Sequence, residues 1–205
     1  MKFESARSLK ELIGKKAFTL ASSSPRRIEF LKKAGIEFDV KTPKVSEEKI
    51  SKDPIKFVLA LSRMKAESVL SEVENGLILG ADTIVVSNRR ILGKPKDSRK
   101  AVLMLKGLSD REHRVYTGLT LVDKDRNKIF SDYQCTKVRF KRLCDREIKD
   151  YVSSGKPLDK AGAYGIQDKG GFLVKGIDGP LDNVIGLPME KLKEMVLHIT
   201  GGGNG

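Results

Sequence analysis

The sequence predicts an α/β fold: a mixed, twisted sheet with flanking helices, arranged as two lobes around a cleft. Segments with the 3.6-residue apolar period of amphipathic helices alternate with short β-branched segments that are typical of buried strands. Two long strand-like segments, 112–122 and 128–140, flank the charged turn 123–127, which predicts an antiparallel hairpin and therefore a mixed sheet. The 205 residues are enough for one such domain over 1–200, followed by a flexible tail at 201–205.

Helices and strands are expected to alternate through the first third of the chain. Ser24 is placed to cap a helix that begins at Pro25, and Asp53 precedes Pro54 in the same way at the start of the longest helix. The apolar side chains of this long helix fall on one face. The expected elements are a helical or frayed extension over 1–16, a strand over 17–22, a helix over 25–34 that Gly35 ends, a strand over 36–41, a polar loop over 42–52 and a helix from 53 to about 70.

The second part of the chain is organised around a central strand over 77–86. Its continuous apolar run fits a strand that is buried on both faces. The elements expected after it are a turn at 88–90 with a returning strand that ends at 93–95, a helix over 98–108, the hairpin, a helix over 145–153, a Gly-rich loop with short strands over 161–179, and a last helix that begins at Pro188 with Met189, Leu192, Val196 and Ile199 on its inner face.

The composition describes a soluble, charge-rich protein with a formal net charge of +13, which favours anionic partners such as nucleotides, nucleic acid or acidic lipid. Cys135 and Cys144 show no CxxC spacing, so we expect free thiols and a reducing, cytoplasmic location. Neither a signal peptide nor an apolar run long enough to span a bilayer is visible, and we expect no membrane association.

Asp82 interrupts the apolar run of the central strand. A buried carboxylate is costly unless it is paired, hydrogen-bonded or bound to a metal. One interpretation is a satisfied structural aspartate, or a β-bulge at Gly80 that redirects one side chain. The other is a functional carboxylate, which is favoured because Lys94 ends the returning strand nearby. An acid and a lysine on neighbouring elements suit a metal-bound phosphate group.

The segment from Ser22 to Arg27 joins a strand to a helix N-terminus, where N–H groups, serine hydroxyls and arginines can bind a phosphate. A plain helix cap with solvated arginines is the alternative. Lys65 lies among apolar or small residues of the long helix, and Glu47 and Glu48 lie in a polar loop. Taken alone, such a lysine usually extends its charged end to water, and such glutamates are usually solvated.

The run 159–167 is rich in small residues that allow a backbone to approach a ligand closely, and Gln167 at its end is suited to read a base edge or to hold water. His113 and His198 belong to no metal or triad pattern and are assigned to structure or surface. Several anion sites, two acid sites and no nucleophile with a paired base together indicate metal-assisted attack of water on a phosphorus centre.

Four motifs carry a resemblance to a known family: LASSSPRR at 20–27, LGADTIV at 79–85, GKP at 93–95 and DKAGAYGIQ at 159–167. From about residue 18 to the last helix the chain closely resembles the Maf family of nucleoside triphosphate pyrophosphatases. The resemblance implies a fold similar to that of the inosine-triphosphate pyrophosphatases, a homodimer, and Mg²⁺- or Mn²⁺-dependent hydrolysis of a nucleoside triphosphate to monophosphate and pyrophosphate. The SPRR and AYGIQ segments match the branch for dTTP, UTP and modified uridine triphosphates rather than the 7-methyl-GTP branch.

The resemblance also implies roles for individual residues. The catalytic residues would be Asp82, Glu47, Lys65 and Lys94, and Asp82 and Glu47 would hold the metal. The nucleotide would be contacted by Ser22, Ser24, Arg26, Arg27, Thr83 and Gln167. Ser46 stands where relatives often carry a second acid, which leaves open how many carboxylates bind the metal.

The expected mechanism is in-line attack of water on the α-phosphorus, with Arg27, Lys65 and Lys94 neutralising the charge that develops. Asp82 is either a metal ligand or the base that orients this water. Gln167 and Thr83 are expected to help select the base, since an amide can match the edge of a uracil. The alternative function is a basic nucleic-acid-binding regulator of cell division or septum formation; the 6% aromatic content and the absence of Trp and of a recognised nucleic-acid motif argue against it.

Overall fold

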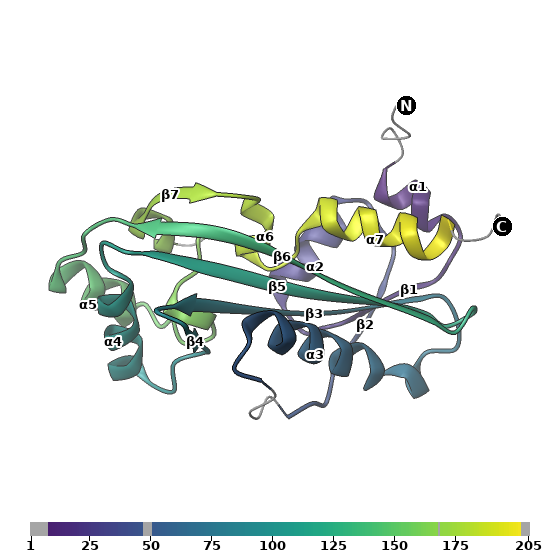
Figure 1. The fold of residues 1–205 in the computed structure, drawn as a ribbon, viewed down its shortest axis with the longest axis horizontal. Helices are drawn as coiled ribbons and strands as arrows, with labels where there is room; N and C mark the ends of the chain where they lie inside the picture. Colours follow the sequence, from purple (N-terminus) through teal and green to yellow (C-terminus); the bar gives the residue numbers. More distant parts are fainter. Residues whose placement is uncertain (1–7, 47–50, 168, 202–205) are drawn as a thin grey trace.

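The computed structural model describes residues 8–46, 51–167 and 169–201 (Figure 1). The expectations for 1–7, for Glu47 and Glu48 and for 202–205 lie outside these residues. The described α-helices are α1 (Leu9–Ile13), α2 (Pro25–Lys33), α3 (Pro54–Glu67), α4 (Ser98–Leu108), α5 (Asp145–Ser153), α6 (Leu181–Ile185) and α7 (Met189–Gly201), with 3-10 turns at Leu70–Glu72, Ala161–Ala163 and Lys169–Leu173. The strands are β1 (Phe18–Ala21), β2 (Asp39–Lys41), β3 (Leu77–Ser87), β4 (Arg90–Leu92), β5 (Glu112–Asp123), β6 (Lys128–Phe140) and β7 (Val174–Asp178).

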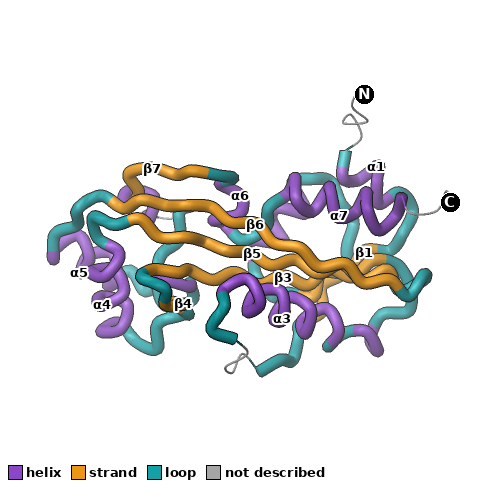
Figure 2. The backbone as a smooth tube through the Cα atoms, in the orientation of Figure 1, coloured by secondary structure: helices purple, strands orange, loops and turns teal. Residues whose placement is uncertain are grey.

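The described strands form one mixed sheet in the order β2-β1-β3-β5-β6-β7, with β4 paired to the far end of β3. β1 pairs in parallel with β2 and β3, whereas every other pair in the sheet is antiparallel. β3, β5 and β6 run along most of the length of the molecule, and helices lie on both sides of them (Figure 2). The predicted α/β class and the predicted hairpin are therefore confirmed.

The apolar core is divided between the two ends of the long strands. Alternate residues of β3 point to opposite faces, so Ile78 and Ile84 pack on the side of α3 while Leu79 packs with α7 on the other side. One cluster gathers α1, α2 and α7 around Leu20, Leu31, Leu79, Leu192 and Met195. A second gathers α4 and α5 around Leu105, Val115, Phe140, Ile148 and Tyr151. The helices of these two clusters lie at opposite ends of the long strands in Figure 1.

The sheet has a gap along one edge of β3, between these clusters. β1 pairs with β3 only as far as Gly80, and β4 pairs with β3 only from Val85 onward. Among the described strands, none lies beside residues 81–84 on that side, although β5 pairs with them continuously on the other. Asp82 and Thr83 point to opposite faces of β3, yet both border the gap because no strand separates the faces there.

Two glycines let α3 lie close to the sheet beside this gap. A Cβ atom on Gly80 would lie 2.1 Å from the backbone oxygen of Ser62, and one on Gly118 would lie 2.4 Å from the backbone oxygen of Val58. Both oxygens belong to α3, so any side chain at either glycine would push the helix away. These contacts hold the side of α3 that carries Lys65 against the strand that carries Asp82.

Some element predictions differ from the structure. The β-bulge considered at Gly80 is not formed, since β3 pairs with β5 there without a register shift; the irregularity lies between Arg139 and Phe140 of β6.

The strand predicted over 36–41 is reduced to β2 because the N–H of Ile36 bonds to the carbonyl of Leu31 and its side chain joins the core. The long helix ends at Glu67 and is followed by a 3-10 turn, and α6 was not predicted because five residues are too few to show a helical period. Gly201, expected in the tail, is the last residue of α7.

Two bulk expectations concern the whole chain. Cys135 and Cys144 are free cysteines, as predicted. Within the described part of the chain, no helix has the length and apolar character needed to cross a membrane.

Candidate active site

The gap beside β3 opens into a cavity of about 1140 Å³. This volume is slightly above the usual range for small-molecule sites and is sufficient for a nucleotide. The predicted site residues that line it are Ser22, Ser24, Arg26, Arg27, Lys65, Asp82, Thr83, Lys94 and Gln167. The structure thus brings together residues from four separated motifs. Glu47, the remaining predicted site residue, lies outside the described residues.

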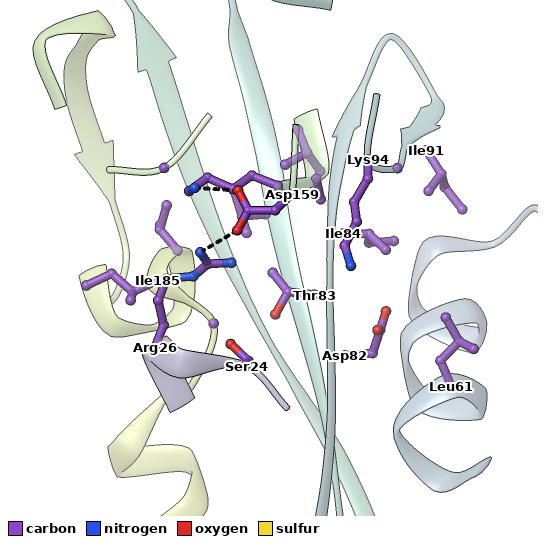
Figure 3. Close-up of a pocket in the computed structure, with 18 of the residues that line it drawn as sticks. Ser24, Arg26, Leu61, Asp82, Thr83, Ile84, Ile91, Lys94, Asp159 and Ile185 are labelled. Carbon is purple, nitrogen blue, oxygen red and sulfur yellow. Dashed lines mark hydrogen bonds and ion pairs between the residues drawn. The ribbon is translucent and has the colours of Figure 1, made fainter. Parts of the chain in front are cut away.

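Asp82 forms a buried ion pair with Lys65. The Nζ atom of Lys65 lies 2.5 Å from an Oδ atom of Asp82, and the two residues are 9% and 7% exposed. Lys65 reaches this position because α3 is seated against Gly80 and Gly118. The pair satisfies the requirement for a compensated buried charge, but it is not sealed from solvent, because both residues line the cavity. Lys94 extends from the loop after β4 into the space above Asp82 (Figure 3).

Arg27 is fixed in the first turn of α2 with its guanidinium inside the protein. Its Nε–H donates to the carbonyl of Gly186 at 2.9 Å, while its two terminal nitrogens donate to Ser22 Oγ and Thr83 Oγ1, both at 3.0 Å. The residue is only 8% exposed. Three different elements therefore hold one planar group whose geometry suits a phosphate. Ser24 occupies the N-cap position of α2, as predicted, but its side chain makes no capping bond.

Arg26 and Asp159 lie on the other side of the cavity from Lys94 (Figure 3). Arg26 approaches Asp159 at 3.6 Å, and Lys160 donates to the same carboxylate at 2.6 Å. Burial opposes the ionisation of Asp159, but the hydrogen bond from Lys160 and the charges of Lys160 and Arg26 outweigh it and hold the pKa of Asp159 below its usual value. Gln167 is exposed at the margin of the cavity.

The charge of the cavity suits a polyanion. Among the described residues that line it, eight are basic and two are acidic. This excess of positive charge attracts phosphates and raises their local concentration. The basic residues are Arg26, Arg27, Lys52, Lys65, Arg89, Arg90, Lys94 and Lys160, and the acidic ones are Asp82 and Asp159.

The described part of the chain contains no group of three or more His, Cys, Asp or Glu residues that could hold a metal ion. Mg²⁺ does not require such a group, since it is commonly held by one or two carboxylates together with substrate phosphates and water. Asp82 supplies one carboxylate at the surface of a cavity rich in cationic side chains. The residues present therefore fit a divalent ion that binds together with a triphosphate.

The structure also shows polar residues that sequence reasoning did not single out. Thr117 and Asn183 are fully buried and are linked by hydrogen bonds to Thr83 and thereby to Arg27. Nothing in the local sequence distinguishes them, because their partners are distant along the chain. His113, assigned to structure or surface, is buried and bonds to Tyr164, whereas His198 is exposed.

Comparisons with known proteins agree with the motifs. A family model described as Maf-like protein matches residues 17–199. A Carboxydothermus hydrogenoformans protein named dTTP/UTP pyrophosphatase is 49% identical over 173 residues, covering 84% of this chain and 93% of that protein. A Thermosipho melanesiensis protein of the same name is 48% identical over 177 residues, covering 86% and 94%. Among solved structures, a nucleoside-triphosphatase, or dITP/XTP pyrophosphatase, from Mycobacterium abscessus has a TM-score of 0.47 at 15% identity, covering 92% of this chain and 98% of that one.

Proposed function

The chain belongs to the Maf-like protein family, and on that basis we propose that it is a nucleoside triphosphate pyrophosphatase that converts dTTP and UTP to the monophosphate and pyrophosphate. The observation that carries this proposal is the meeting of Asp82, Lys65, Lys94 and Arg27 in one cavity. A carboxylate surrounded by cations suits phosphoryl chemistry, in which positioning and charge stabilisation supply most of the catalysis.

We assign the phosphates to the cations along the gap in the sheet. The N-terminus of α2 offers backbone N–H groups, and the anchored guanidinium of Arg27 lies beside them. Lys65 pairs with Asp82, and Lys94 extends into the space above the same carboxylate (Figure 3). With the triphosphate between these groups, the negative charge that develops on the α-phosphorus and on the departing pyrophosphate is stabilised by fixed cations.

Asp82, with Glu47 from outside the described residues, would hold a divalent ion such as Mg²⁺ or Mn²⁺. When bound, such an ion neutralises phosphate oxygens and favours the attack of water on phosphorus. Lys65 keeps the Asp82 carboxylate in place beside the cavity through their ion pair. In the alternative role, the same carboxylate would act as the base that orients the attacking water, which would approach the α-phosphorus opposite the leaving pyrophosphate.

We assign base selection to Gln167, which lines the cavity and is exposed. An amide side chain offers both a donor and an acceptor, and the edge of uracil or thymine presents one donor and two acceptors. Modified uridine triphosphates keep this edge and are included in the proposed substrate class. We further propose a cytoplasmic location, in agreement with the free cysteines, and a homodimer, as the family resemblance implies.

The proposal is tested with a panel of nucleoside triphosphates in the presence of Mg²⁺ or Mn²⁺, scored for monophosphate and pyrophosphate. We expect dTTP and UTP to be turned over faster than purine nucleotides, a chelator to abolish the reaction, and the substitution Asp82→Asn to slow it on the order of 10²-fold or more. Release of diphosphate and inorganic phosphate, or equal turnover by Asp82→Asn, would contradict the proposal. A steep salt dependence of DNA binding without any turnover would instead favour the nucleic-acid-binding alternative.

A further inference from the structure

A chain of buried and partly buried hydrogen bonds runs from Arg27 through β3 and β5 to α6. Arg27 donates to Thr83 Oγ1 at 3.0 Å, Thr83 and Thr117 join their hydroxyl groups at 3.0 Å, and Thr117 donates to the backbone carbonyl of Asn183 at 3.1 Å. Thr83 and Thr117 are directly opposite each other on the antiparallel strands β3 and β5. Cross-strand threonines in this arrangement face the same side of the sheet, so their contact follows from the register.

The two ends of this hydrogen-bond chain, the Arg27 guanidinium and the carbonyl of Asn183, determine which group donates in each bond. An arginine can only donate and a carbonyl can only accept. Each threonine hydroxyl has one proton, and Thr117 uses its own on the carbonyl of Asn183. The proton between Thr83 and Thr117 must therefore come from Thr83. Bonds ordered in one direction polarise one another, which strengthens the chain.

This order limits what Thr83 can do for a substrate. Its single proton is committed to Thr117, and one of its two acceptor sites is used by Arg27. Thr83 therefore has no donor to offer a phosphate oxygen or a carbonyl of a base. Ser22, which holds the other terminal nitrogen of Arg27, accepts from Arg27 and from the N–H of Ser24.

α6 and the residue directly after it, at the far end of this hydrogen-bond chain, are themselves bonded to the sheet and to Arg27. The amide of Asn183 donates to the carbonyl of Val115 at 3.1 Å and to Thr136 Oγ1 at 3.0 Å, which ties the helix to β5 and β6. The carbonyl of Gly186, directly after α6, accepts from Nε of Arg27. One short, anchored segment thus supports the guanidinium twice, directly through Gly186 and indirectly through Asn183 and the two threonines.

We propose that Thr117 is a positioning residue: through Thr83 it fixes the orientation of the Arg27 guanidinium for the pyrophosphate part of the substrate. Thr83 serves as a link in this chain, rather than as a donor that reads the base. The inference rests on the proposed function for the identity of the anion, but it predicts a property of binding that is measured without turnover.

The test compares Thr117→Val, which keeps the shape and removes the hydroxyl, with Thr117→Ser, which keeps the hydroxyl. We expect Thr117→Val to weaken the binding of inorganic pyrophosphate, measured by calorimetry, and to lower kcat/KM for dTTP, each about tenfold. Thr117→Ser should stay within about twofold of the wild-type protein. Thr120→Val is the matched control, because Thr120 is an equally buried threonine of β5 whose hydroxyl bonds to Ser62 and Ser131 instead.

A double-mutant cycle separates positioning from simple loss of packing. In an Arg27→Ala background, Thr117→Val should have no further effect on pyrophosphate affinity, since the group it positions is gone. Equal weakening in both backgrounds, or the same loss in Thr120→Val, would overturn the inference. If Thr117→Val does not fold, Thr83→Val cuts the same chain at a less buried position and is judged by the same cycle. A wild-type protein that binds pyrophosphate but hydrolyses no triphosphate would refute the proposed function alone.

Discussion

The ammonium group of Lys65 lies 2.5 Å from the carboxylate of Asp82, and both residues line the cavity rather than the closed core. A buried ion pair contributes little net stability, because the cost of desolvating two charges offsets their attraction. A role in stability alone also does not explain why the pair lies at the edge of a cavity that is lined with further cations. The position of the pair, more than its existence, favours a role in binding phosphate.

Asp82→Asn is expected to lower kcat for dTTP on the order of 10²–10⁴-fold, because the variant keeps the shape of the side chain but loses its charge. It also removes the negative charge that pairs with the buried ammonium of Lys65, which should lower the free energy of unfolding by up to about 3–5 kcal/mol. Urea unfolding measures the second effect. Adding Lys65→Met should restore stability without restoring turnover, whereas near-normal turnover by Asp82→Asn would refute the catalytic assignment.

Gly118→Ala is expected to lower both stability and activity. Its Cβ atom would lie 2.4 Å from a backbone oxygen of α3, so the helix must move and carry Lys65 away from Asp82. A loss of about 1–3 kcal/mol is expected for such overpacking, with a fall in kcat/KM. Gly107→Ala is the control, since a Cβ there meets no atom within 4 Å and Gly107 lies within α4. This control should gain about 0.5–1 kcal/mol and keep full activity; if both variants behave alike, the close approach of α3 is unimportant.

Removal of divalent ions should stop turnover without unfolding the protein. In a site whose carboxylates depend on a metal for compensation, a chelator would lower the thermal midpoint. Here the ion pair with Lys65 already compensates Asp82. We therefore expect the unfolding temperature in chelator to match that in Mg²⁺ when no nucleotide is present. Adding dTTP together with Mg²⁺ to a non-hydrolysing variant should raise it; a large fall in chelator alone would indicate a structural metal instead.

His113 should make the protein less stable in acid. Burial lowers the pKa of His113 from 6.5 to about 4, so the unfolded chain takes up this proton before the folded protein does. Stability is then fully present above pH 6.5 and is lost as the pH falls toward 4, by about 3 kcal/mol in total. Urea unfolding at several pH values should show a flatter acid dependence for His113→Phe than for the wild-type protein.

The control for this acid effect is His198→Gln, which alters an exposed histidine. In this variant the free energy of unfolding should depend on pH as it does in the wild-type protein. His113→Phe also loses the hydrogen bond to Tyr164, so its stability at neutral pH should be lower even while its slope is flatter. An unchanged slope in His113→Phe would show that other groups cause the acid sensitivity.

The sequence predicted nine of the described residues that line the cavity, but not how they are connected. Asp82 stands out because a charge in an apolar strand needs an explanation. Lys65 does not, since a lysine on a helix is ordinary. Their contact depends on Gly80 and Gly118, which admit α3 to the sheet, and the predicted alternative for Gly80 was a bulge. Helix–sheet distance is a tertiary property that no local pattern encodes.

The same reason explains what was missed. Thr117 lies in an ordinary alternating strand, and Asn183 lies in a helix of five residues that shows no period. Their importance arises from partners between 34 and 66 positions away along the chain. The gap in the sheet edge was also hidden, because it depends on where β1 stops and β4 begins along β3.

The central claim is that water attacks the α-phosphorus of dTTP within this cavity, and hydrolysis in H₂¹⁸O tests it directly. With Mg²⁺ or Mn²⁺ present, mass spectrometry of the products should find one ¹⁸O atom in the thymidine monophosphate and none in the pyrophosphate. Label in the pyrophosphate, or formation of thymidine diphosphate with inorganic phosphate, would place the attack at another phosphorus and contradict the account.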